Sequence, residues 1–145
     1  MRVLIQRVGS ASVEVENRLV GSIGSGLLLF VGFGHSDSPD LLPQAVRKIS
    51  EMRVFSDDNG KLNLSLRDIG GQALIVSQFT LYANCSRGRR PDFTPAADPA
   101  IAEQLYDSFV ALFRETGITV QTGIFAADML VNLINDGPVT FFLEF

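Results

Sequence analysis

The chain has 145 residues, 46% of them hydrophobic and 19% charged, which predicts one folded domain with a single core over residues 1–145. Twelve Lys and Arg against 16 Asp and Glu give a net charge of −4, which excludes the basic surplus typical of proteins that wrap nucleic acid. The longest apolar run, LLLFV, is far shorter than the roughly 20 residues that span a bilayer. One cysteine excludes an internal disulfide, so we expect a cytoplasmic protein with no membrane partner.

The first third of the chain is rich in strand patterns. Residues 2–8 predict a strand, and the alternation of Ala11, Val13 and Val15 with polar residues predicts a second, half-buried one. GLLLFVGFG is continuously apolar, as expected of a strand covered on both faces. A helix should follow, with Ser38 as its cap and Pro39 in its first turn. Its buried face should consist of Leu42, Ala45, Val46, Ile49 and Met52.

The rest of the chain predicts more strands and a second helix. SDDNGK at residues 56–61 indicates a turn, and GGQALIVSQFTLYA becomes strongly β-prone after its glycines. A helix fits residues 99–116, with Asp98 as cap, Gly117 as its end and a buried stripe of Ile101, Leu105, Phe109 and Leu112. Three closing strands fit residues 118–123, 129–134 and 139–145, the last two joined by a hairpin turn in NDGPVT. The order predicts an α+β fold whose curved sheets carry two helices outside.

Common catalytic signatures are missing from the sequence. His35 is the only histidine and the acidic residues are scattered, so we expect no metal site and no cofactor. A dyad of Cys85 and His35 is possible in principle, but neither lies in a recognised nucleophile motif. The sequence contains no G-x-S-x-G, P-loop or dinucleotide fingerprint.

The segment SQFTLYA places polar side chains at the end of an apolar strand. By strand alternation, Gln78 and Thr80 should share one face, and Ser77 and Phe79 the other. Polar groups among apolar neighbours need hydrogen-bond partners from the protein or from a ligand. The pattern therefore indicates either a pocket at this strand end or a strand that leaves the core for solvent.

SQFTL followed later by NDGPVT resembles the two signature motifs of the D-aminoacyl-tRNA deacylase family, also called D-tyrosyl-tRNA deacylases. IQRV, RVFSD, RGRRPDF and TGIFAADM also resemble that family, in its order and from end to end of the chain. The resemblance implies a homodimer of β-barrel-like subunits with helices packed outside. It implies hydrolysis of the ester that joins a D-amino acid, or glycine, to the terminal ribose of tRNA.

The resemblance also implies roles for particular residues. The catalytic pocket should be formed by Ser77, Gln78, Phe79 and Thr80. A cis Gly-Pro pair should reach into the partner's pocket and select chirality, in a substrate-binding set of Gly137, Pro138, Arg7, Asn135 and Met129. Arg7 should hold that pair in place. The acceptor end of D-aminoacyl- or glycyl-tRNA should meet the basic cluster of Arg87, Arg89 and Arg90, which on charge alone reads as a solvated loop.

The sequence leaves the mechanism and the class of function open. Thr80 can act as a nucleophile, or the free ribose hydroxyl can help to activate water while amide N–H groups near Phe79 and Thr80 stabilise the oxyanion. The lack of a base beside Thr80 favours the second route, with Thr80 as a lining residue. Two alternatives remain, a small-molecule D-amino-acid esterase or amidase that uses Thr80, and a noncatalytic module that binds D-amino acids.

Overall fold

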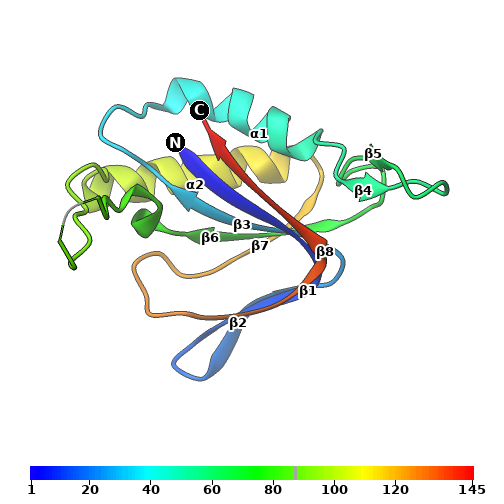
Figure 1. Ribbon diagram of the computed structural model, residues 1–145, viewed down its shortest axis with the longest axis horizontal. Helices are drawn as coiled ribbons and strands as arrows, with labels where there is room; N and C mark the ends of the chain where they lie inside the picture. Colours follow the sequence, from blue (N-terminus) through cyan, green and yellow to red (C-terminus); the bar gives the residue numbers. More distant parts are fainter. Residues whose placement is uncertain (87) are drawn as a thin grey trace.

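The computed structural model describes every residue except Arg87 (Figure 1). Its elements, in chain order, are β1 (Arg2–Val15), β2 (Arg18–Ile23), β3 (Gly26–Gly32), η1 (Pro39–Leu41), α1 (Leu42–Ser50), β4 (Phe55–Ser56), β5 (Leu62–Leu64), β6 (Gln72–Ser77), η2 (Phe79–Tyr82), α2 (Pro99–Glu115), β7 (Thr119–Thr122) and β8 (Leu130–Glu144). Within the described part of the chain, no helix is long and apolar enough to cross a membrane.

Six strands form one strongly curved sheet. Its order is β2-β1-β3-β6-β7. Strand β8 pairs with β1 along the edge of β1 that faces away from β2 and β3. The first half of the long strand β1 pairs with β3 and its second half with β2. Strand β2 comes so close to the end of β7 that a Cβ added at Gly21 would lie 2.7 Å from the carbonyl oxygen of Thr122. The sheet therefore nearly closes on itself, and the predicted α+β, barrel-like fold is confirmed.

Each face of the sheet carries its own hydrophobic core. Helices α1 and α2 lie together on one face (Figure 1), where they cover Leu27, Leu29 and Val31 of β3. On the other face, inside the curl of the sheet, Leu28 packs in a smaller core with Val8, Ala11, Val13, Ile23, Leu74 and Val76. Every residue of β3 except Phe30 is buried, which confirms the prediction of a strand covered on both faces.

The two helices differ from the predicted ones at their first turns. Pro39 opens the short 3-10 helix η1 rather than α1, and the Ser38 side chain makes no capping hydrogen bond. In α2 the stripe through Leu105 and Phe109 is buried as expected, and Gly117 follows the helix with φ +81°. Ile101 is 50% exposed, so the buried stripe of α2 does not include its first turn.

The strand boundaries also differ from the predicted ones. Residues 2–8 and 11–15 belong to one continuous strand, β1, and NDGPVT lies inside one long strand, β8. Both flanks of NDGPVT pair with β1 instead of with each other, and the register jumps from Gln6↔Thr140 to Val8↔Asn135. Residues 136–139 therefore bulge outward opposite Arg7, and the predicted hairpin is wrong. The local pattern could not show that a distant strand would pair with both flanks.

Candidate functional site

The SQFTL segment lies where β6 ends and η2 begins. The strand stops at Ser77, and the N–H of Gln78 still donates to the carbonyl of Val31 at 2.7 Å. The chain then turns into η2, where the N–H of Leu81 donates to the carbonyl of Gln78 and the Gln78 side-chain amide donates to the hydroxyl of Thr80. The predicted strand alternation from Gln78 to Thr80 is therefore wrong, because a 3-10 turn replaces the strand there.

A cavity of about 500 Å³ opens beside this turn. One wall comes from the ends of β3 and β6, and the other from the first turn of α2 and from the loop that precedes β8. The lining residues on the first wall include Val31, Phe33, Val76, Ser77, Gln78 and Phe79. Apolar side chains dominate these walls, and the polar lining side chains are Ser77 and Gln78 on the first wall and Asp128 on the other, as is common in small-molecule pockets.

The cavity brings together Ser77, Gln78, Phe79 and Met129 from the predicted site residues. Met129 enters from the loop before β8, and its sulfur packs against Gly123, where an added Cβ would lie 2.5 Å away. Thr80 is exposed and stands outside the described lining. Its hydroxyl faces the Gln78 amide at the rim instead.

The sequence reasoning missed most of the wall opposite Ser77. This wall contains Phe125, Ala126, Ala127 and Asp128, together with Ala96, Ala97, Pro99 and Ala102. Phe125 also packs against Tyr106 of α2, with ring centroids 5.9 Å apart. The motif TGIFAADM pointed to this loop, but small apolar residues carry no chemical signal that would single them out.

Arg7, on the neighbouring strand β1, binds the NDGPVT bulge at Asp136. Its guanidinium is almost fully buried and donates from Nε to the carbonyl of Asp136 at 2.9 Å and from Nη1 to the carbonyl of Val54 at 2.8 Å. The same Nε lies 3.3 Å from the exposed Asp136 carboxylate. A single side chain thus fixes the peptide that precedes Gly137.

The side chain of Asn135 links the two ends of the bulge. Its side-chain oxygen accepts the N–H of Val139 at 2.9 Å, and its Nδ2 donates to the carbonyl of Val139 at 3.2 Å. Gly137 has φ +150°, and a Cβ there would lie 2.6 Å from the nitrogen of Val139. The Gly137–Pro138 peptide bond is cis. The bulge therefore has a defined shape that requires glycine at position 137.

The bulge and the cavity of the same chain are separate. The described residues that line the cavity include none from 135–140 and do not include Arg7. One chain therefore carries both parts of the predicted site without joining them.

The loop with the basic cluster lies at the rim of the cavity. Phe93 packs edge-on against Phe79, with ring centroids 5.0 Å apart, and Asn84 and Asp92 pair their backbones at the base of the loop. Arg89 and Arg90 are exposed, while Arg87 lies outside the described residues. His35 Nε2 lies 2.7 Å from the carbonyl of Thr94, and neither His35 nor Cys85 is among the described lining residues.

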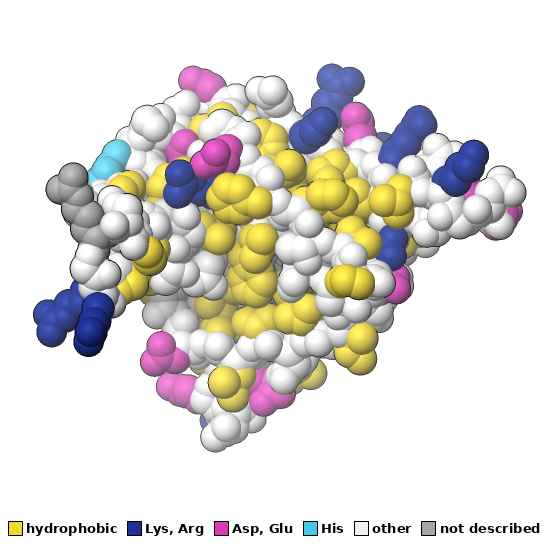
Figure 2. Space-filling model, viewed as in Figure 1, with side chains coloured by type: hydrophobic (Ala, Val, Ile, Leu, Met, Phe, Trp, Pro, Cys, Tyr) yellow, Lys and Arg dark blue, Asp and Glu magenta, His cyan; other side chains and the backbone are white. Residues whose placement is uncertain are grey.

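Figure 2 shows hydrophobic side chains across the middle of the face along which β8 runs in Figure 1. The large exposed ones on β8 are Leu130 at 64%, Ile134 at 67% and Phe142 at 50%. They stand on both sides of the bulge along one strand. This surface is distinct from the cavity and is here called the β8 patch.

Comparison with solved structures gives the class of fold. A structure described as "c-Myc DNA Unwinding Element Binding Protein" superposes with a TM-score of 0.93 at 39% identity, covering 99% of this chain and 98% of that one. A second, described as a probable eukaryotic D-amino acid tRNA deacylase, has a TM-score of 0.86 over 98% of this chain and 97% of that one. At 20% identity this second likeness shows the fold alone.

Sequence comparison then gives the family. The model of the D-Tyr-tRNA(Tyr) deacylase family matches residues 4–144. A D-aminoacyl-tRNA deacylase of Thermotoga petrophila is 51% identical over 144 residues, which cover 99% of this chain and 97% of the relative. The chain belongs to the D-Tyr-tRNA(Tyr) deacylase family of enzymes, as its motifs predicted.

Proposed function

We propose that this protein hydrolyses the ester between a D-amino acid and the terminal ribose of tRNA, as a single domain in the cytoplasm. The observation that carries the proposal is the largely apolar cavity, with the polar side chains of Ser77 and Gln78 beside Phe79 on one wall. Its volume of about 500 Å³ suits an aminoacyl group together with part of a nucleoside. Membership of the deacylase family supplies the reaction class.

The chemistry uses main-chain groups and the substrate itself. Water adds to the ester carbonyl, the bond to the ribose oxygen breaks, and that oxygen takes up a proton as the free amino acid leaves. The amide N–H groups of Phe79 and Thr80 open η2, where the first N–H groups of a helix have no acceptor inside it. Such donors stabilise a developing oxyanion, and in known enzymes one donor contributes about 2.7–4 kcal/mol. The ribose hydroxyl beside the ester helps to activate the water, so Thr80 need not attack.

Chirality is selected by the bulge of a partner subunit. Each cavity lacks residues 135–140 of its own chain, whereas the bulge is rigidly held by Arg7 and Asn135 and projects from the sheet. Inserted into a partner's cavity, its backbone fills the space that the side chain of an L-amino acid would occupy. Glycine has no side chain to clash there and is accepted.

The β8 patch provides the contact for a homodimer. Leu130, Ile134 and Phe142 are exposed apolar groups on a strand that also carries the bulge. Large exposed apolar side chains that share one strand favour a protein contact along that strand. A two-fold dimer through β8 presents each bulge to the other subunit, so that both cavities are completed by the same symmetry.

The RNA end enters over the rim that Phe79 and Phe93 form. Arg89 and Arg90 extend from the same loop as Phe93, at the place where phosphates of a single-stranded end would pass. A contact limited to the acceptor end is compatible with a net charge of −4, because few phosphates need to be neutralised.

The test is hydrolysis of matched substrates by the purified protein with EDTA present. D-aminoacyl-tRNA should be deacylated, glycyl-tRNA should be accepted to some degree, and the matched L-aminoacyl-tRNA should survive. A D-aminoacyl methyl ester, which lacks ribose, should react poorly. Efficient cleavage of the methyl ester would favour a small-molecule esterase, and no turnover of any substrate would favour a binding module.

A further inference from the structure

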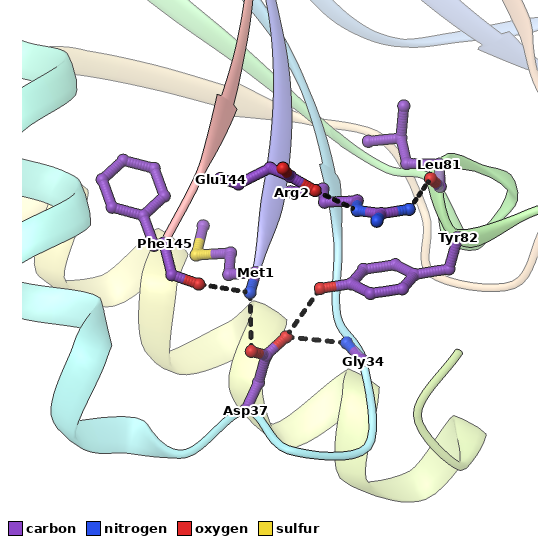
Figure 3. Close-up of polar contacts among 8 residues, drawn as sticks. All are labelled: Met1, Arg2, Gly34, Asp37, Leu81, Tyr82, Glu144 and Phe145. Carbon is purple, nitrogen blue, oxygen red and sulfur yellow. Dashed lines mark hydrogen bonds and ion pairs between the residues drawn. The ribbon is translucent and has the colours of Figure 1, made fainter. Parts of the chain in front are cut away.

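Tyr82, the last residue of η2, is held on three sides (Figure 3). Its hydroxyl donates to Asp37 Oδ2 at 3.1 Å, and the Arg2 guanidinium carbon lies 4.5 Å from its ring centroid, a cation–π contact. The ring also presses against Gly34, where an added Cβ would lie 2.5 Å from Cε1. The Tyr82 side chain is therefore held by contacts to three different residues.

Arg2 and Asp37 are fixed in their turn by other parts of the chain. Arg2 Nε donates to Glu144 Oε1 at 2.7 Å, and its Nη1 donates to the carbonyl of Leu81 at 3.0 Å. The Asp37 side chain is 7% exposed, and its carboxylate accepts hydrogen bonds from the Met1 ammonium at 2.6 Å and from the N–H of Gly34 at 2.7 Å. Arg2, Asp37 and Tyr82 are here called the Tyr82 cluster.

The Tyr82 cluster keeps the Tyr82 hydroxyl a donor. Burial, followed by the negative charge of Asp37 and the hydrogen bond to it, raises the pKa of Tyr82 above its ordinary value. The phenol consequently stays protonated through the neutral range, and the contact to Asp37 persists there.

The cluster acts on the cavity through η2. Leu81 and Tyr82, which the cluster grips, are the second half of a four-residue turn whose first half is Phe79 and Thr80. Because η2 is only four residues long, a displacement of Tyr82 should also displace Phe79 and Thr80. None of the three cluster residues is among the described lining residues, whereas Gln78 and Phe79, at the start of the turn that ends at Tyr82, are among them.

We propose that Arg2, Asp37 and Tyr82 are positioning residues that hold the Gln78–Phe79 corner in its productive place. The inference rests on the proposed deacylase function and adds to it. Small displacements of reacting groups cost rate steeply, whereas binding spread over the apolar walls changes little. Loosening the cluster should therefore lower kcat and leave KM nearly unchanged.

The test compares Tyr82→Phe, Arg2→Ala and Arg2→Lys on D-aminoacyl-tRNA, well below the unfolding temperature of each variant. Tyr82→Phe removes one oxygen and keeps the ring, so it should fold. We expect kcat to fall about threefold to tenfold in Tyr82→Phe and further in Arg2→Ala, with partial recovery in Arg2→Lys. KM should stay within about twofold, as should the Kd for a nonhydrolysable RNA end that carries an amide-linked D-amino acid.

Arg47→Ala is the matched control, because it breaks an exposed ion pair to Glu51 at 3.4 Å on α1, away from η2. It should change neither kcat nor KM. Unchanged kcat in Tyr82→Phe and Arg2→Ala, with only the melting temperature lowered, would overturn the positioning role. If the unaltered protein fails to deacylate D-aminoacyl-tRNA, the proposed function itself fails, which is a distinct result.

Discussion

At the scale of single residues, Arg7 is the most informative side chain. Its guanidinium joins the carbonyl of Asp136 on β8 to the carbonyl of Val54 before β4, and it is almost fully buried. In the sequence, the role of Arg7 could be expected only from the family resemblance. The bulge opposite Arg7 explains its position, because the missing ladder bonds of β1 leave room for a guanidinium.

Replacing Arg7 with alanine should damage activity more than folding. The carbonyls of Asp136 and Val54 lose their donor, which costs about 1–3 kcal/mol of unfolding free energy for buried groups of this kind. The bulge also loses its anchor, so turnover of D-aminoacyl-tRNA should fall at least about tenfold. Arg18→Ala, at an exposed position on β2, is the control for both measurements. Full turnover by a destabilised Arg7→Ala protein would contradict the anchoring role.

Gly137 and Gly60 offer a matched pair of substitutions to alanine. Both have positive φ, at +150° and +74°, but a Cβ at Gly137 would lie 2.6 Å from the Val139 nitrogen, whereas nothing lies within 4 Å of one at Gly60. Gly60→Ala should cost about 1 kcal/mol of stability and keep full turnover. Gly137→Ala should deform the bulge and abolish most D-specific turnover. Equal turnover by the two variants would show that the shape of the bulge does not matter.

His35 and Cys85 should be dispensable. They are the only histidine and the only cysteine, and neither is among the residues described as lining the cavity. The alanine variants of both residues should keep most deacylation, as should the unaltered protein in EDTA. A collapse of kcat in any of these three assays would return a thiol, an imidazole or a metal to the mechanism.

At the scale of elements, the sequence predicted what depends on local pattern. Both helices, the doubly covered strand β3 and the strand that leads to Ser77 follow from periodicity and burial of apolar residues. The bulge in β8 could not be predicted from local pattern. Asp-Gly between apolar runs predicts a hairpin, and only the pairing of both flanks with β1 prevents one here. The turn at η2 was missed for a similar reason, since Phe79, Leu81 and Tyr82 are equally suited to a strand.

The packing of α2 on β6 should make the protein sensitive to alkaline pH. The Tyr106 hydroxyl is buried and donates to the carbonyl of Ile75 at 2.8 Å, and burial, followed by the charge of Asp107, raises its pKa above the ordinary value of 10.0. The unfolded chain loses this proton at lower pH than the folded chain does. Stability due to the neutral phenol is therefore complete below pH 10 and is lost as the pH rises.

Urea unfolding at pH 9 and pH 11 tests whether the free energy of unfolding falls as the pH rises. Above pH 10 each such tyrosine should lower the free energy of unfolding by about 1.4 kcal/mol per pH unit. The pKa of Tyr82, the second of the two tyrosines, is raised as well, so Tyr106→Phe should remove only part of the slope. A slope that Tyr106→Phe leaves unchanged would exclude the buried phenol as its cause.

At the scale of the whole molecule, the proposed active site requires two chains. The cavity and the bulge are each well formed, yet they are separate within one chain, and the β8 patch offers apolar surface beside the bulge. The sequence could indicate a dimer only through the family resemblance, since exposed Leu130, Ile134 and Phe142 cannot be told from core residues by pattern alone.

Mixed dimers test this shared site most directly. One subunit carries Gly137→Ala, and the other carries Ala102→Trp, which fills the cavity from α2. Each homodimer should be inactive on D-aminoacyl-tRNA. Equal amounts of the two proteins are mixed and allowed to exchange subunits. In each mixed dimer, the open cavity of the Gly137→Ala subunit receives the intact bulge of its partner. Because half of the dimers are then mixed and each has one working cavity of two, about a quarter of the original activity should return. No recovery from a verified mixture of dimers would contradict a site completed across the subunits.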